Sequence, residues 1–232
     1  MPRLLVFLVL TGVCARQLPN LPKLLPVDAA RQDPSLQVVR DQVLAAVRAR
    51  NARTVMSFVS PRVRWDSTSD TEGSDWRRLD EALSRPEDDQ WTRLEESLKL
   101  GGAFTTRRGA VRGRLEFCAP YVFAAFPDVV PHEVHGEGMP WVVTDKDVEV
   151  HSAPDLKSAV LGRLSYALVQ ASGGERHDVR SYDTLWQTVA LPEDQEGFIL
   201  AEQIRNPEDG HVCFAKEGGS WLISLVARRG DP

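Results

Sequence analysis

Short apolar runs separated by turn residues dominate the stretch from residue 141 to residue 207. The runs occupy residues 142–154, 159–164, 185–191 and 197–204. They are rich in valine, isoleucine, leucine and aromatic residues, and several such runs in succession are typical of the strands of a sandwich or barrel. We therefore predict a small closed β-barrel over 141–207, with Gly197 at a sharp bend of the backbone.

Before this stretch the apolar residues recur with the period of a helix. Asp33-Pro34 is a favourable helix start, because aspartate caps and proline fits the first helical position. One helical face then carries Leu36, Val39, Val43, Leu44 and Val47. Asn51 is placed to cap a second short helix, and residues 63–65 alternate like the start of a strand. Residues 76–83 and 91–100 predict two further helices.

The end of the chain predicts a β-hairpin. Residues 211–216 and 221–228 are β-like runs joined by Glu-Gly-Gly-Ser, which is a strong hairpin signal. An isolated hairpin is marginal in water, so it must pack on another part of the chain. We predict an α+β fold, in which an N-terminal helical and α+β domain (16–130) is completed by the C-terminal hairpin (208–232). A linker at 131–140 leads into the barrel.

Residues 1–15 have the layout of a secretory signal peptide. A positive start, Met-Pro-Arg, is followed by an apolar run from Leu4 to Leu10 and by small residues before Arg16. We predict that this segment is removed and that the protein is exported to the periplasm. Two alternatives stay open: the segment is a buried N-terminal strand or helix, or Cys14 is lipid-modified and anchors a lipoprotein.

Export would leave Cys118 and Cys213 as the remaining cysteines. Two thiols in an oxidising compartment indicate one disulfide, and the alternative is two buried free thiols. Cys118 lies in the aromatic segment 115–128, which we expect to be buried close to the end of the chain. A disulfide would tie that segment to the hairpin and make the barrel an insertion in the α+β domain.

Composition narrows the partners that we expect. The 232 residues are 42% hydrophobic and 26% charged, as in a globular protein with a packed core. The net charge of −5 argues against a nucleic-acid surface, which needs a basic stripe. No apolar run approaches the ~20 residues of a membrane-spanning helix. We expect a monomer that binds no nucleic acid and has no transmembrane segment.

The motifs of the barrel stretch resemble those of bacterial SH3 (SH3b) domains. The matching segments are Val148–Pro154 for the first strand, Ala159–Leu164 for the next segment, Trp186–Val189 for the central Trp-x-x-Val strand, and Gly197–Ile204 for the closing Gly-aromatic segment with its helical turn. The resemblance implies an SH3-like small β-barrel and, as ligands, cell-wall peptide or envelope protein. Glu149 and His151 stand where those domains usually have Asn and Arg, and the segment 171–185 is long.

The wider layout is similar to that of bacterial exported proteins in which an SH3b domain follows a Cys-Ala-Pro-Tyr-Val-Phe segment, here residues 118–123. The paired starting helices, the strand and the closing hairpin with Gly219-Ser220-Trp221 are also similar to the nuclear transport factor two-like cone fold. That second likeness concerns only the α+β domain.

No motif in the sequence carries catalytic chemistry. A Gly-x-Ser-x-Gly elbow, His-Glu-x-x-His and a phosphate-binding glycine-rich loop are all absent. A Cys–His nucleophile pair needs a free thiolate, which a disulfide would forbid. Paired carboxylates arise by chance among 33 acids. We predict that the protein is not an enzyme and needs no cofactor.

Two clusters contain residue types that bind cations. His132, Glu133, His135 and Glu137 lie between prolines and glycines, where no helix is expected to bring them onto one face. Glu87, Asp88 and Asp89 precede a helix, where acids complement the helix dipole. We therefore predict no metal site.

SH3-type barrels bind extended peptides in shallow, aromatic-lined grooves. The candidates for such a groove are Tyr166, Tyr182, Trp186 and Phe198, together with Arg176, His177 and Arg180, which can meet a carboxylate. Barrel core is the alternative for Trp186 and Phe198, and solvated loop is the alternative for the others.

The function that we predict is that of a non-enzymatic periplasmic binding protein whose SH3b module recognises cell-envelope peptide or protein. One alternative is a cell-wall hydrolase or amidase accessory enzyme. Another is a structural or sensing subunit whose barrel contacts a partner protein.

Overall fold

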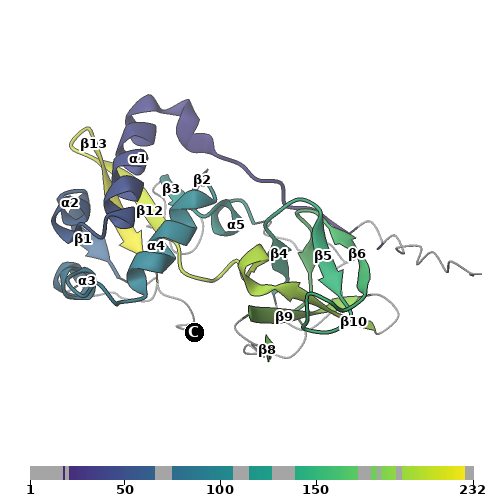
Figure 1. Cartoon of the computed structure of the whole chain (residues 1–232). Helices are drawn as coiled ribbons and strands as arrows, with labels where there is room; N and C mark the ends of the chain where they lie inside the picture. The colour runs from purple at the N-terminus through teal and green to yellow at the C-terminus, as the bar shows by residue number, and fades with distance from the viewer. Residues whose placement is uncertain are drawn as a thin grey trace, which may run out of the picture.

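The computed structural model has two parts that lie side by side, a helix-covered sheet and a strand-rich part (Figure 1). It describes residues 18, 21–65, 75–106, 115–126, 139–171, 179–181, 184–191 and 195–227. Helices and strands are both present, so the predicted α+β class is confirmed. The predicted signal peptide, Cys14, and residues 131–138 of the predicted linker lie outside the described residues.

The first helices begin where the sequence predicts. A 3-10 turn, η1 (Ala29–Gln32), leads into α1 (Pro34–Arg48), and the Asp33 carboxylate accepts hydrogen bonds from the N–H groups of Ser35 (2.9 Å) and Leu36 (3.2 Å). Asn51 caps α2 (Ala52–Ser57) by accepting the Thr54 N–H at 3.1 Å. Each cap satisfies backbone donors that have no partner within the helix.

The strand after α2 begins earlier than predicted, and the two helices that follow it lie where the sequence predicts them. Strand β1 (Val59–Arg64) starts earlier than the alternation at 63–65 predicts. It is an edge strand, which is where a sheet tolerates a proline such as Pro61. Helices α3 (Asp75–Leu83) and α4 (Gln90–Lys99) confirm the two predicted helices, and Gly101 follows α4 with a positive φ of 71°.

Strands from both ends of the chain form the five-stranded sheet, in the order β1-β13-β12-β3-β2. Besides β1, the strands are β2 (Ala103–Thr105), β3 (Glu116–Ala119), β12 (Val212–Glu217) and β13 (Ser220–Val226). β12 and β13 pair antiparallel around Gly218 and Gly219, and β13 also pairs parallel with β1. The C-terminal strands therefore lie in the middle of a sheet that the N-terminal segment begins.

The predicted disulfide is confirmed. Cys118 in β3 and Cys213 in β12 are directly opposite each other in the antiparallel ladder, with Cα atoms 4.0 Å apart and a sequence separation of 95. Both side chains are fully buried. The link therefore joins two neighbouring strands that the whole strand-rich part separates along the sequence.

The strand-rich part follows the short helix α5 (Tyr121–Ala124). Its elements are β4 (Trp141–Val143), β5 (Val148–His151), β6 (Val160–Leu164), β7 (Leu168–Val169), β8 (Val179–Ser181), β9 (Thr184–Leu191), β10 (Gln195–Leu200), η2 (Ala201–Gln203) and β11 (Ile204–Arg205). They form two sheets, in the orders β6-β5-β10-β9-β8 and β11-β4-β7.

The two sheets do not close into one hydrogen-bonded ring among the described residues, so the closed barrel that we predicted is corrected to two sheets. β7 and β11 have only two residues each, which leaves few ladder hydrogen bonds to continue the ring. The sheets still share one core, to which Val143 and Ile204 contribute from one sheet and Val150, Val189 and Ile199 from the other.

Residues 21–24 run along the strand-rich part before η1 begins. The Leu168 N–H donates to the Pro22 carbonyl at 2.8 Å, and the Leu24 N–H donates to the Tyr166 carbonyl at 2.9 Å. Leu18 and Leu21 pack on the core of the strand-rich part. This extended segment, with its leucines docked on the core, fastens the start of the helical part to β7.

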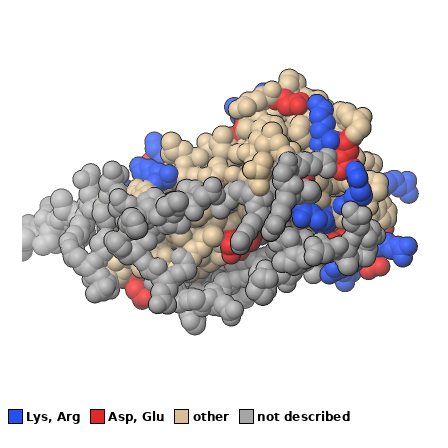
Figure 2. All heavy atoms as spheres, turned by 180° about the vertical axis from the view of Figure 1, so that it is seen from behind, with Lys and Arg blue, Asp and Glu red and all other residues tan. Residues whose placement is uncertain are grey.

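Charges of both signs cover the described surface. On the face shown in Figure 2, lysine and arginine side chains of the helix-covered part lie next to aspartate and glutamate side chains. Among the described residues, no helix has the length and apolarity needed to cross a membrane.

Candidate functional site

A pocket of about 1010 Å³ opens where the two parts meet, and we call it the junction pocket. α4 forms one wall, and the strand-rich part forms the others. The lining residues are Glu96, Lys99, Leu100, Trp141, Thr144, Asp145, Leu156, Leu185, Gln187, Leu200, Ala201, Glu202, Gln203, Ile204, Arg205 and Asp209. This volume lies at the upper end of the range for ligand sites, ~300–1,000 Å³.

Two exposed leucines give the pocket an apolar ledge. Leu156 is 61% exposed and Leu185 is 37% exposed. Leu156 stands in a turn that local hydrogen bonds fix, since the Asp155 carboxylate accepts the Lys157 N–H at 3.0 Å and the Ser158 hydroxyl donates to the Ala153 carbonyl at 3.0 Å. Full burial of a fully exposed leucine contributes ~1.5–3 kcal/mol, so a ligand that covers the remaining exposed surface of these two leucines gains about that amount from the pair together.

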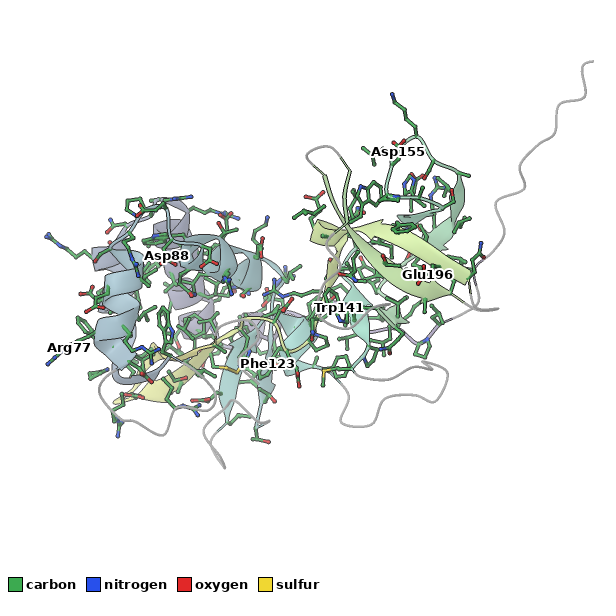
Figure 3. The ribbon with its side chains drawn as sticks, turned by 90° about the horizontal axis from the view of Figure 1, so that it is seen from below. Arg77, Asp88, Phe123, Trp141, Asp155 and Glu196 are labelled. Carbon is green, nitrogen blue, oxygen red and sulfur yellow. A yellow bond between two sulfur atoms is a disulfide. The ribbon has the colours of Figure 1, made fainter. Side chains whose placement is uncertain are left out.

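Trp141 adds an aromatic surface to the pocket. It is half-buried at the start of β4 and packs on the core of the strand-rich part. In Figure 3 it lies where the helix-covered part meets the strands. Large, rigid aromatic side chains of this kind supply contact area at low entropic cost.

Arg205 holds one wall of the pocket in place. Its guanidinium donates hydrogen bonds to the Ser97 hydroxyl (3.1 Å) and to the Gly210 carbonyl (2.7 Å), and it lies 3.8 Å from the Glu96 carboxylate. These contacts run from β11 to α4 and to the turn before β12. The arginine therefore joins the two parts of the molecule beside the pocket.

A buried aromatic cluster closes the junction behind this wall. Tyr121, Val122 and Phe126 pack there against Val142 and Leu168. The Tyr121 hydroxyl has no hydrogen-bond partner among the described residues. Burial raises the pKa of the Tyr121 phenol far above its ordinary value. The phenol is therefore neutral, and its role here is packing.

None of the three aromatic groove candidates that the structure describes, Tyr166, Trp186 and Phe198, lines the junction pocket. Trp186 is fully buried, with its ring edge-on to His151 at 5.2 Å between centroids, so its side chain belongs to the core and cannot line a groove. Tyr166 and Phe198 are half-buried. The core alternative therefore holds for Trp186.

The cationic groove candidates stay predictions. Arg180 lies in β8, but its side chain is outside what the structure describes. Arg176, His177 and Tyr182 are themselves outside the described residues.

Sequence reasoning missed the residues that form the pocket. Leu156 was the detectable signal, because a leucine between Asp155 and Lys157 in a polar turn has no structural reason to be apolar. The share of α4 in the pocket could not be detected. It depends on how the two parts dock, which no local pattern encodes.

A serine, a histidine and a glutamate meet on β5 and the following turn. His151 Nδ1 lies 3.4 Å from the Ser158 hydroxyl, and Nε2 lies 3.6 Å from the Glu149 carboxylate. Both distances exceed the ~2.6–3.2 Å of a working nucleophile–base pair. The Ser158 hydroxyl donates to a backbone carbonyl, and Glu149 pairs with Arg163. The group therefore fixes a turn and gives the hydrolase alternative no support.

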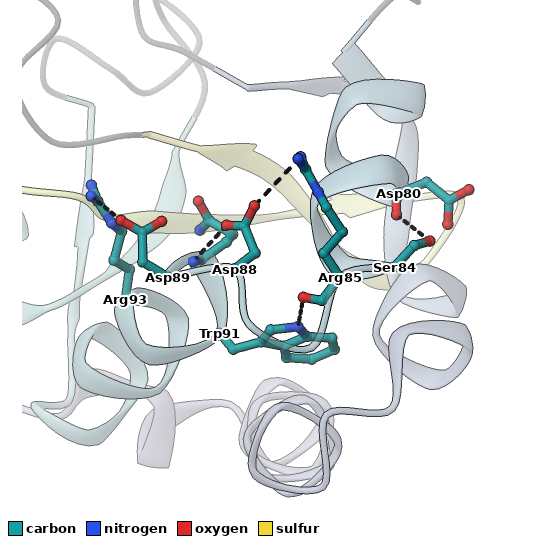
Figure 4. Close-up of polar contacts among 8 residues, drawn as sticks. Asp80, Ser84, Arg85, Asp88, Asp89, Trp91 and Arg93 are labelled. Carbon is teal, nitrogen blue, oxygen red and sulfur yellow. Dashed lines mark hydrogen bonds and ion pairs between the residues drawn. The ribbon is translucent and has the colours of Figure 1, made fainter.

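Two of the three acids before α4, Asp88 and Asp89, form ion pairs (Figure 4). Asp88 lies 3.5 Å from Arg85 and accepts the Gln90 N–H at 2.9 Å, and Asp89 pairs with Arg93. The Trp91 indole donates to the Arg85 carbonyl at 3.1 Å, which pins the turn to the core. These contacts explain the acids as helix-start and turn residues.

One further group has metal-binding residue types. Atoms of Glu116, Cys118 and Cys213 lie within 4.8 Å of one another, and all three side chains are buried. Cysteine binds a metal as the thiolate, and both sulfurs here are in the disulfide. The predicted metal-type residues 132–137 lie outside the described residues.

Neither a protein-family model nor a curated protein matches the chain. Among solved structures, a chain titled as a variant of Rd1NTF2_05 is 11% identical, covers 85% of this chain and 97% of its own, and has a TM-score of 0.26. A TM-score this low carries no argument. The resemblances to SH3b domains and to the nuclear transport factor two-like fold therefore stay predictions.

Proposed function

We propose that the chain is a non-enzymatic binding protein of the cell envelope, with an SH3b-like module that recognises envelope peptide or protein through the junction pocket. The observation that supports this is the pocket itself. It is large and open, and it carries Leu156 and Leu185 exposed beside Trp141. Exposed apolar side chains grouped in a concave surface are typical of interaction sites.

Two features support a place outside the cytoplasm. The confirmed disulfide is of the kind that persists in oxidising compartments. Residues 1–15 have the sequence layout of a signal peptide. On this proposal the exported protein works in the periplasm, and lipid modification at Cys14 is the alternative that would hold it at a membrane.

The test is retention of the mature protein by envelope material. Purified peptidoglycan and immobilised envelope proteins are two separate arms, and we expect at least one to retain the wild type. The double variant Leu156→Ser/Leu185→Ser should lose retention, because it removes the apolar ledge. Both side chains are exposed, so folding is expected to be unaffected, and circular dichroism checks this.

A matched control changes two apolar side chains of similar exposure elsewhere. Leu25 is 63% exposed and Val38 is 55% exposed, and neither lines the pocket. Leu25→Ser/Val38→Ser should therefore keep wild-type retention. The proposal fails if a known wall-binding module is retained while the wild type passes through both arms, or if the ledge variant and its control are retained equally.

A further inference from the structure

We infer that the junction pocket selects an extended polypeptide segment in which lysine or arginine side chains lie next to apolar ones. The inference rests on the proposed function and adds the chemical class of the ligand. Three observations carry it: the sign of the charge around the pocket, the exposed leucines in the same lining, and the outer strand β11 in the wall.

Acidic groups outnumber basic groups in the lining. The acids are Glu96, Asp145, Glu202 and Asp209, and the bases are Lys99 and Arg205. Arg205 is held by its hydrogen bonds to Ser97 and Gly210 and is close to Glu96, so its charge is compensated within the wall. An approaching ligand therefore meets a negative rim, which Lys99 offsets only in part.

Two of the acids are available to a ligand. Asp145 and Glu202 are both exposed, and neither forms an ion pair within the part of the chain that the structure describes. Asp145 follows β4, and Glu202 lies in η2. Both carboxylates thus belong to segments that adjoin the β4–β11 pair.

β11 gives the wall a strand edge. It is the outer strand of its sheet, with β4 as its one neighbour among the described strands. In an antiparallel pair, residues alternate between bonding the neighbour and pointing their N–H and C=O groups away from it. Because the Thr144 N–H donates to the Gln203 carbonyl, this alternation turns the backbone groups of Ile204 away from β4, and Ile204 lines the pocket although it is only 5% exposed. An extended peptide can add to such an edge.

The expected free energies indicate which contacts supply affinity and which supply selectivity. An exposed ion pair contributes ~0.2–1 kcal/mol, whereas covering the exposed surface of Leu156 and Leu185 together contributes ~1.5–3 kcal/mol. The ledge therefore supplies most of the affinity. The acids decide which peptides are accepted, because a glutamate beside Asp145 or Glu202 is repelled.

The test uses three fluorescein-labelled synthetic peptides of equal length, which alternate leucine with lysine, glutamine or glutamate. Fluorescence polarisation measures their binding to the full mature chain. We expect the lysine peptide to bind at least about tenfold more tightly than the glutamate peptide, with the glutamine peptide between them, which corresponds to ~1.4 kcal/mol. Added salt should shrink this difference, because it screens exposed charges.

The variant Asp145→Lys/Glu202→Lys should weaken binding of the lysine peptide about tenfold. Its matched control, Glu81→Lys/Glu196→Lys, changes the net charge equally at exposed sites outside the pocket and should leave affinity within about twofold. The inference is overturned if the two variants behave alike, if the glutamate peptide binds as well as the lysine peptide, or if no peptide binds at about 1 mM.

These outcomes separate the inference from the proposed function. The Leu156→Ser/Leu185→Ser variant can lose envelope retention while Asp145→Lys/Glu202→Lys is fully retained. The pocket is then the binding site, but it does not select cationic peptides. If both variants are fully retained, the pocket is not the binding site, and the inference is wrong as well.

Discussion

The two parts of the molecule differ in how far along the sequence their strand pairs reach. In the strand-rich part, three of the six pairs among the described strands join consecutive strands (β5–β6, β8–β9 and β9–β10), and the other three stay within residues 141–205. In the helix-covered part, β1 pairs with β13, and β3 pairs with β12. Non-local pairing must overcome the entropy of closing a long loop, whereas hairpins close short ones.

The disulfide lies in the helix-covered part, whose strand pairs span the longest stretches of sequence. It links β3 and β12, the pair that encloses the whole strand-rich part along the sequence. The strand-rich part contains neither of the two bonded cysteines, and its own small hydrophobic core stabilises it. The comparison therefore predicts that the two parts differ in what destabilises them, and substitutions can test this one part at a time.

Removal of the disulfide is the largest expected effect. Cys118→Ala/Cys213→Ala should lower the free energy of unfolding by about 4 kcal/mol, because a cross-link over 95 residues restricts the unfolded chain strongly. Hydrogen exchange should show the loss of protection in β3, β12 and β13 and much less in β5 and β10. Urea unfolding gives the magnitude.

The wild type refolded in reductant is the control for this prediction, since it keeps both sulfur atoms and lacks only the bond. It should behave like the double variant. Equal loss of protection in both parts would show that they unfold as one unit, and the contrast between them would then be wrong.

A smaller effect, confined to the other part, is expected at Gly197. A Cβ there would lie 2.4 Å from Val150 Cγ1 and 3.1 Å from Leu191 Cδ1. Gly197→Ala should therefore cost about 1–3 kcal/mol of overpacking. The loss of protection should fall in β5, β9 and β10, and the disulfide-linked strands should keep theirs.

Val150→Ala in the Gly197→Ala background makes room for the added methyl group. A double-mutant cycle should show favourable coupling between the two sites, because they are in direct contact. Additive effects would mean that the clash is relieved elsewhere, and an unchanged stability of Gly197→Ala would contradict the close packing of β5 on β10.

Gly197 also shows what could be read from the sequence. Its importance was predicted, but the reason was wrong: the structure needs the space between β10 and Val150, which depends on a contact across strands. Local signals were reliable. Asp33 and Asn51 cap the helices that they were predicted to cap. The parallel pairing of β13 with β1 and the docking of α4 on the pocket have no local signal.

The cysteine pair was the one non-local relation that could be predicted from the residues alone, because covalent chemistry restricts partners far more than apolar packing does. The core of the strand-rich part could be assigned by composition, but a closed ring could not be distinguished from two sheets with short strands. The pocket was missed for a related reason. Its residues come from both parts, and only Leu156 is out of place in its local sequence.

The smallest expected effect is a pH dependence that belongs to the helix-covered part. Hydrogen bonds from Ser35, Leu36 and the Trp221 indole, with Lys216 nearby, lower the pKa of Asp33 from 3.8 to about 2. A carboxyl whose pKa is lower in the folded state stabilises that state above its unfolded pKa. This contribution is lost as the pH falls from about 4 to about 2.

Asp33→Asn keeps a side-chain oxygen that can cap α1 but removes the titrating group. The wild type should be the more stable protein near neutral pH, and the difference should shrink on acidification towards pH 2 as Asp33 is protonated. Urea unfolding at a series of pH values measures it. Asp155→Asn, in an exposed turn of the strand-rich part, is the control and should leave the pH profile of β12 and β13 unchanged. A difference between wild type and Asp33→Asn that is constant with pH would show that the carboxylate charge does not link α1 to the hairpin.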